Sequence, residues 1–231
     1  GAYGRLRVDI NFSSDKFAVE YRSGSYGISG TIANELGQNL NIATGSWNHY
    51  AVSFANSGSF AVAKLYRNGT LNDIISQSTS PVIGSVTGSM VSRLGSLTSR
   101  MPDDNGELAD ASTQSWGKLS GSVDEFRFWK IERTDKEISE NWFTQVNGGT
   151  NSDFALEYSS SAKYDYDSPI NLGVYYKFNE GIIGSSSVSS QDAVVLDYSG
   201  KAVNGSWTGY SLGARNTGSA MVLSDAAAFE F

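Results

Sequence analysis

The residues with the clearest capacity for chemistry are oxygen ligands gathered in one polar stretch, residues 101–116. They are Asp103, Asp104, Asn105, Glu107 and Asp110. Hard cations such as calcium take roughly six to eight oxygen ligands, mostly from carboxylates and carbonyls. A turn at Asn105-Gly106 would bring several of these oxygens together. Their spacing does not match a helix–loop–helix calcium site, so the alternatives are another kind of calcium site and a solvated acidic loop.

Asp124 and Glu125 form the next acidic pair, which raises the question of glycoside hydrolysis. The two catalytic carboxyls of a glycosidase lie about 5–5.5 Å or about 6.5–9.5 Å apart on one face of a site. Adjacent strand residues point to opposite faces, so this pair is not expected to act together. We expect Asp124 to be buried near the following helix and Glu125 to pair with a neighbour such as Arg127. The one histidine, His49, is expected to be a hydrogen-bonded core or sheet residue rather than a catalytic base.

Aromatic side chains could provide a platform for sugars, because their faces suit the apolar faces of pyranose rings. Three of the five tryptophans, Trp47, Trp129 and Trp142, fall in predicted regular elements and are expected in the core. The predicted carbohydrate-binding residues are Trp116, Trp207 and Tyr210. The alternative for this set is packing at the edge of the fold.

The elements that must position these groups are short strands. The chain has 25 Gly and only 3 Pro, and short alternating apolar runs are bounded by Gly, Ser and Asn, which is typical of all-β proteins. Period-two alternation predicts strands around residues 6–10 and 17–21, and further strands over 28–32, 47–54, 60–67, 71–75, 93–97, 172–178, 194–196 and 219–223. Asn68-Gly69 is a strong hairpin signal, because a type I′ turn needs positive φ at both central residues.

A strand followed by a helix is predicted next along the chain. Residues 121–129 alternate as a strand. Thr134 with Glu137 three residues later predicts a capping box, and Ile138 and Trp142 form the apolar stripe of a short helix. Many strands with one helix predict an all-β, two-sheet jelly-roll sandwich.

Charge and composition exclude several classes of protein. The 17 basic and 24 acidic residues give a formal net charge of −7 with no basic run, so no nucleic-acid partner is expected. No apolar stretch approaches the roughly 18 residues needed to span a membrane, so no membrane insertion is expected. With 0 Cys, disulfide scaffolds, thiolate metal sites and cysteine nucleophiles are excluded.

Three motifs in order resemble the laminin-G-like, concanavalin A-like jelly-roll family. They are Trp47-x-His49-x-Ala51-Val52, Leu65-Tyr66-Arg67-Asn68-Gly69, and the run from Gly121 to Trp129 followed by Thr134–Trp142. The resemblance covers about residues 5–143 and implies a concanavalin A-like sandwich with a short helix after the Asp-Glu strand. It also implies calcium as a cofactor at a rim, although no ligand can be carried over residue by residue.

The tail resembles the opening of such a module. Gly173–Gly181, Asp197-Tyr-Ser-Gly200 and Asn204-Gly205 carry this likeness. Two parts are therefore expected: a jelly-roll body over residues 1–160, and a segment over 161–231 that either closes the same jelly roll or begins a following copy.

The resemblance implies a non-enzymatic structural or adhesion module of a larger assembly. Such modules are frequent in tailed-phage virion proteins, so a virion is the expected location and a secreted or cell-surface protein the alternative. The expected partners are host-surface glycans, bound through rim loops, or neighbouring virion subunits, with a homo-oligomer as a further expectation. A purely structural oligomerisation module and a glycoside hydrolase or lyase on the same fold remain the alternative functions.

Overall fold

The computed structural model describes a little over half of the chain. The described residues are 4–23, 28–42, 45–57, 59–78, 92–95, 119, 121–144, 171–178 and 194–206. They divide between two units. The first unit comprises Gly1–Val86, Arg127–Tyr175 and Asp197–Val203, and the second comprises Thr87–Phe126, Tyr176–Leu196 and Asn204–Phe231. The described residues form mostly β-structure with one short helix, and no helix among them is long and apolar enough to cross a membrane.

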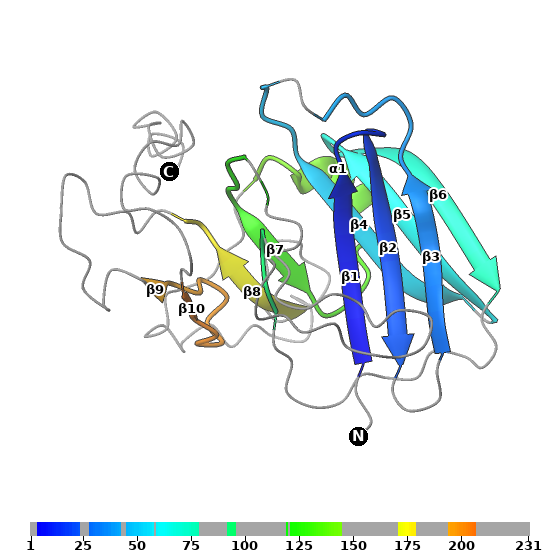
Figure 1. Cartoon of the computed structure of the whole chain (residues 1–231). Helices are drawn as coiled ribbons and strands as arrows, with labels where there is room; N and C mark the ends of the chain where they lie inside the picture. Colours follow the sequence, from blue (N-terminus) through cyan, green and yellow to red (C-terminus); the bar gives the residue numbers. More distant parts are fainter. Residues whose placement is uncertain are drawn as a thin grey trace, which may run out of the picture. The chain divides into compact units, whose positions relative to one another are not determined.

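The first unit begins with an antiparallel three-stranded sheet in the order β1-β2-β3 (Figure 1). Its strands are β1 (Gly4–Asn11), β2 (Lys16–Ser23) and β3 (Ile28–Leu36). The β1–β2 register runs unbroken from Gly4↔Ser23 to Asn11↔Lys16, whereas the β2–β3 register shifts near Val19. The hairpin predicted between the first two alternating runs is confirmed.

A second antiparallel sheet follows in the order β4-β5-β6. Its strands are β4 (Tyr50–Ser57), β5 (Phe60–Arg67) and β6 (Thr70–Ser78). Asn68 and Gly69 have φ of 48° and 78° and join β5 to β6, which confirms the predicted Asn-Gly turn. Leu65 pairs with Asp73 across these strands, and the register shifts by one residue between Leu65 and Tyr66.

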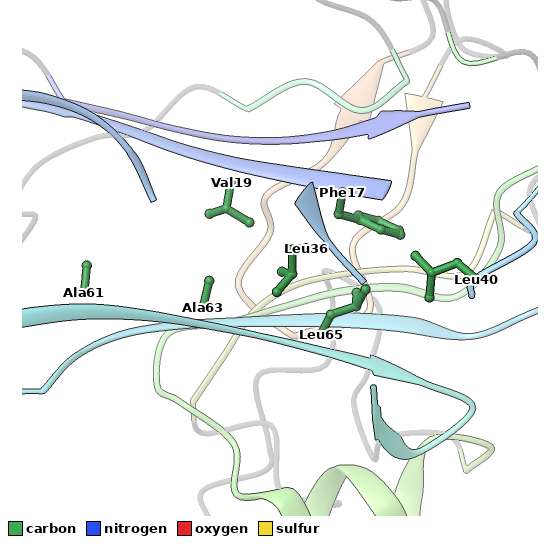
Figure 2. Packing of buried hydrophobic residues seen from close by; sticks show 7 residues of the cluster. All are labelled: Phe17, Val19, Leu36, Leu40, Ala61, Ala63 and Leu65. Atoms are coloured by element: carbon green, nitrogen blue, oxygen red, sulfur yellow. The ribbon is translucent and has the colours of Figure 1, made fainter. Parts of the chain in front are cut away.

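The apolar faces of these two sheets meet in one buried cluster (Figure 2). Its members are Phe17, Val19, Leu36, Leu40, Ala61, Ala63 and Leu65. The period of two explains the set: alternate residues of β5 point into the cluster, and the residues between them point to the other face. Small Ala61 and Ala63 lie opposite larger side chains, which fills the space between the sheets without overlap.

The helix packs against the second sheet, and a short strand precedes it in the chain. β7 is Phe126–Trp129 and α1 is Asp135–Asn141. Thr134 and Glu137 form the predicted capping box, with Glu137 N donating to Thr134 Oγ1 at 3.2 Å. The buried Tyr66 hydroxyl donates to Asp135 Oδ1 at 2.6 Å, which ties α1 to β5. Hydrogen bonds from Tyr66 and Lys64 lower the Asp135 pKa, so this link stays ionised near neutral pH.

β8 (Leu172–Tyr176) pairs with β7, and a tight turn from the tail packs on it. The fully buried Asp197 accepts four hydrogen bonds, from Tyr175 N (2.9 Å), Ser199 N (3.0 Å), Ser199 Oγ (2.7 Å) and Val203 N (3.0 Å). A buried carboxylate is tolerated only when its oxygens are satisfied in this way. The Asp-x-Ser-Gly motif of the tail is therefore a structural turn.

The second unit has fewer described residues. β9 (Val194–Val195) and β10 (Gly205–Ser206) form a short antiparallel pair. The Tyr176 ring stacks near Phe126, with ring centroids 6.2 Å apart. The predicted strand at residues 93–97 is wrong over Arg93–Gly95, which have no strand conformation, and the predicted boundary at residue 160 lies outside the described residues.

Candidate functional site

The site residues predicted from the sequence lie outside the described part of the chain. This holds for the calcium set, Asp103, Asp104, Asn105, Glu107 and Asp110, and for the aromatic set, Trp116, Trp207 and Tyr210. Both sets stay predictions. Within the described residues there is no group of three or more His, Cys, Asp or Glu that could hold a metal ion.

The described residues instead place a different polar surface around the β5–β6 turn. The Asn68 side chain accepts a hydrogen bond from His49 N at 2.8 Å, while Asn68 N donates to His49 O at 2.9 Å. These two hydrogen bonds connect the turn to the segment that precedes β4. The left-handed backbone of Asn68 keeps its amide on the surface, where the side chain is exposed.

Asn48 is the centre of this surface. Its Oδ1 accepts hydrogen bonds from Arg67 Nε (3.3 Å), Arg67 Nη2 (3.2 Å) and Asn68 Nδ2 (3.1 Å). Its Nδ2 donates to Ser46 O at 3.2 Å, which orients the amide. The positively charged Arg67 guanidinium therefore donates to a neutral amide oxygen within the network.

The Asn72 side chain extends the network along β6 by pairing with the backbone of Gln38. Gln38 N donates to Asn72 Oδ1 at 2.7 Å, and Asn72 Nδ2 donates back to Gln38 O at 2.9 Å. Arg67 Nη1 reaches Asn39 O at 3.5 Å, which links this pair to the turn. We call this surface the amide rim: Gln38, Asn39, Asn48, Arg67, Asn68 and Asn72.

Aromatic side chains flank the amide rim. Trp47, next to Asn48, is 51% exposed, and Phe143 is 69% exposed. Trp142 packs over Gly69 and lies 6.0 Å from the His49 ring and 5.5 Å from the Phe143 ring, centroid to centroid. The expectation that Trp47 belongs to the core is wrong. β4 begins at Tyr50, so no strand alternation turns Trp47 inward.

The His49 ring contacts one of these aromatic residues, Trp142. Burial, and then the positive charge of Arg127, lower its pKa from 6.5 to about 4, so the imidazole is neutral at ordinary pH. His49 lies just before β4, which begins at Tyr50, so it is not a strand residue as expected, and its backbone hydrogen bonds join it to the Asn68 turn. Its buried Nδ1, however, has no hydrogen-bond partner in the described part of the chain.

The Asp124–Glu125 pair differs from expectation in its backbone. β7 begins only at Phe126, and Glu125 has a φ of 53°, so the predicted alternation over residues 121–129 is wrong before Phe126. Asp124 is partly buried, and its Oδ1 accepts a hydrogen bond from Glu125 N at 3.0 Å. Burial and the neighbouring Glu125 charge raise the Asp124 pKa to about 6. The argument from opposite strand faces therefore does not apply to this pair.

One sequence signal could have located the amide rim. Asn68 falls in the predicted turn, and Asn48 and Asn72 fall near the starts of predicted strands. Such positions place short polar side chains at the surface. What the sequence could not show is that residues about 20–35 apart meet there, because this depends on the pairing of β4, β5 and β6.

The family comparison agrees with this architecture. A laminin-G-type family model described as the concanavalin A-like lectin/glucanases superfamily matches residues 2–139. Searches of curated proteins and of solved structures found no match. The matched range covers more than half of the chain and includes β1 to β7 with the amide rim. The chain therefore belongs to the concanavalin A-like lectin/glucanase superfamily.

Proposed function

We propose that this chain is a non-enzymatic glycan-binding module, and that the amide rim with Trp47 is its binding surface. The observation that carries the proposal is a tryptophan that is 51% exposed beside a network of hydrogen-bonded amides. An exposed indole offers a flat apolar face, and the amides offer fixed donors and acceptors. This combination suits a sugar ring, which has an apolar face and polar edges.

The chemistry of the rim favours a neutral glycan. Asparagine and glutamine amides both donate and accept, as vicinal hydroxyl groups do. The Arg67 guanidinium already donates to Asn48 Oδ1 and Asn39 O, which reduces its capacity to attract an anion. Asp73, beside the rim, has its Oδ2 occupied by Gly37 N at 2.8 Å. No charge of either sign is presented without a local partner in the described rim.

The wider proposal keeps the sequence-based expectations. The two sheets with their shared cluster are the centre of a jelly-roll sandwich, and the module works within a larger virion or extracellular assembly. Calcium bound at residues 103–110 would order that loop, as hard cations do with carboxylate oxygens. Binding at the amide rim would use its side-chain amides and the Trp47 indole.

Glycan-array binding by the purified chain, with calcium and with a chelator, tests the function. Trp47→Ala is expected to weaken binding at least about tenfold, which corresponds to about 1.4 kcal/mol. The matched control is Phe60→Ala, because Phe60 is 48% exposed at the opposite end of β5 from Arg67. Its binding should equal that of the wild type.

Other outcomes would relocate or reject the site. Loss on Trp116→Ala, Trp207→Ala or Tyr210→Ala, with Trp47→Ala unaffected, would move the site to the sequence-predicted aromatic set. Loss on chelation alone would point to the Asp103–Asp110 loop. No binding to any glycan would contradict the proposal and favour a purely structural module.

A further inference from the structure

Three short segments without charged residues meet at one end of the amide rim. They are residues 47–49 before β4, residues 68–70 at the β5–β6 turn, and residues 142–144 after α1. Hydrogen bonds join the first segment to the second, and the indole of the third packs on the turn. None of these segments contains Asp, Glu, Lys or Arg, so together they form an uncharged surface that is continuous with the rim.

Phe143 is the most exposed side chain of this surface, although both of its neighbours in the chain are anchored. Its own exposed fraction is 69%. On one side, the Trp142 indole packs so closely over Gly69 that a Cβ on Gly69 would overlap it. On the other side, Thr144 N and Thr144 Oγ1 donate to Asn141 O at 3.3 and 3.0 Å. The Phe143 ring is therefore a positioned platform, and a ligand that stacks on it has little side-chain entropy to remove.

A continuous series of contacts connects the two exposed aromatic residues, Trp47 and Phe143. Trp47 is followed by Asn48, whose Oδ1 accepts a hydrogen bond from Asn68 Nδ2 at 3.1 Å. The turn that contains Asn68 lies under Trp142, and the Trp142 and Phe143 rings are 5.5 Å apart, centroid to centroid, with their planes at 82°. Since the turn and Trp142 separate the two exposed rings in this series, the surface offers two places for a sugar to stack, with amides between them.

We propose that the amide rim binds an extended, neutral oligosaccharide, in which one sugar stacks on Trp47 and another sugar, farther along the chain, stacks on Phe143. This inference rests on the proposed glycan-binding function, and it adds the class of glycan and a second stacking residue. Once the first sugar is bound, the contact of the second with Phe143 is intramolecular and increases the affinity. Affinity should therefore rise with the length of the oligosaccharide until it reaches both rings, and then level off.

Titration calorimetry of the full chain with oligosaccharides of increasing length tests the second stacking position. The probes are the malto- and cello-oligosaccharides and the glycan that the array selects, each from the monosaccharide to the hexasaccharide. In the selected series, the wild type should bind the hexasaccharide at least about tenfold more tightly than the monosaccharide. Phe143→Ala should remove most of this gain and leave the affinity for the monosaccharide unchanged. Trp47→Ala should weaken binding at every length.

Two further variants separate stacking from a structural effect. Phe143→Trp keeps an aromatic face and should keep the dependence on length. Phe12→Ala removes a ring that is 44% exposed between β1 and β2, and it should change the affinity at no length. Urea denaturation of Phe143→Ala should show the stability of the wild type, because an exposed ring adds little to the packing.

Three results would overturn this inference while the chain remains a glycan-binding module. The first is a wild type that binds the monosaccharide as tightly as the hexasaccharide. The second is a Phe143→Ala variant that either keeps the full gain with length or weakens binding equally at every length. The third is an array that selects only acidic glycans. Absence of binding to any glycan would instead contradict the proposed function itself, and this inference with it.

Discussion

Two turns in the first unit each bind a neighbouring segment through one polar side chain, and the two side chains differ in burial. At the amide rim, the exposed Asn68 side chain accepts one backbone N–H, from His49. At the tail turn, the fully buried Asp197 accepts four hydrogen bonds, two of them from Tyr175 N and Val203 N. The Asn68 turn uses a neutral amide that water can reach, and the Asp197 turn uses a carboxylate that water cannot reach.

The difference in depth separates the roles of the two turns. Removing a buried acceptor leaves donors without water or protein partners, which costs each of them about 1–3 kcal/mol. Removing an exposed acceptor costs much less, because water replaces it. The tail turn is therefore expected to govern stability, and the rim is the surface that can exchange its contacts for those of a ligand.

The largest effect is expected for Asp197→Ala. The four donors that face Asp197 would lose their acceptor in a buried site, so the free energy of unfolding should fall by about 4 kcal/mol. Urea denaturation of the purified variant measures this change.

Asp73→Ala is the matched control for Asp197→Ala. Asp73 also accepts several hydrogen bonds, from Gly37 N, Gln38 Nε2 and Ile74 N, but it is only partly buried. Its loss should reduce the free energy of unfolding by about 1 kcal/mol. Equal losses for the two variants would show that depth does not set the difference.

The sheets were predictable because local signals determine them. Alternation located β1, β2 and β5, and Asn68-Gly69 located the β5–β6 hairpin, since this dipeptide suits positive φ. The start of β7 was not predictable, because the left-handed Glu125 arises from its surroundings rather than from its own propensity. The exposure of Trp47 was missed for a related reason: the point at which β4 begins depends on contacts with the turn of another hairpin.

Gly69→Ala is expected to have the next largest effect. Gly69 has a φ of 78°, and a Cβ there would overlap the Trp142 indole. Backbone strain and the displaced ring together should lower the free energy of unfolding by about 3 kcal/mol. Gly45→Ala separates the two contributions, because Gly45 has a φ of 72° but open space around its Cβ position. Gly45→Ala should lower the free energy of unfolding by only about 1 kcal/mol, measured for both variants by thermal or urea denaturation. If Gly69→Ala also lost only about 1 kcal/mol, Trp142 would not pack on the turn as described.

The pH dependence of stability sharpens the comparison at the rim. The His49 pKa is lowered from 6.5 to about 4, so the unfolded chain binds a proton more readily between these values. The contribution of His49 to stability is therefore complete above pH 6.5 and falls by about 3 kcal/mol as the pH drops from 6.5 to about 4, with little further change below that. His49→Gln should remove this loss in denaturation curves recorded from pH 7 to 4.

Asp124 provides a control of opposite sign for the His49 measurement. Its pKa is raised from 3.8 to about 6, so its contribution to stability is present below pH 3.8 and is lost as the pH rises through 6. Asp124→Asn should therefore steepen the acid loss that His49→Gln removes. A His49→Gln variant as acid-sensitive as the wild type would contradict the assignment to His49.

The smallest effect on stability, and the sharpest separation of the two turns, is expected for Asn68→Gly. Glycine keeps the positive φ of 48° but removes the amide that contacts His49 N and Asn48 Oδ1. The free energy of unfolding should fall by no more than about 1 kcal/mol, because water can replace both contacts. Glycan binding should nevertheless weaken by about tenfold, since one amide of the rim and its contact with Asn48 Oδ1 are gone. Asn41→Gly, at another exposed asparagine with a φ of 49°, should change neither property. An Asn68→Gly variant that binds as tightly as the wild type would place ligand recognition outside the amide rim.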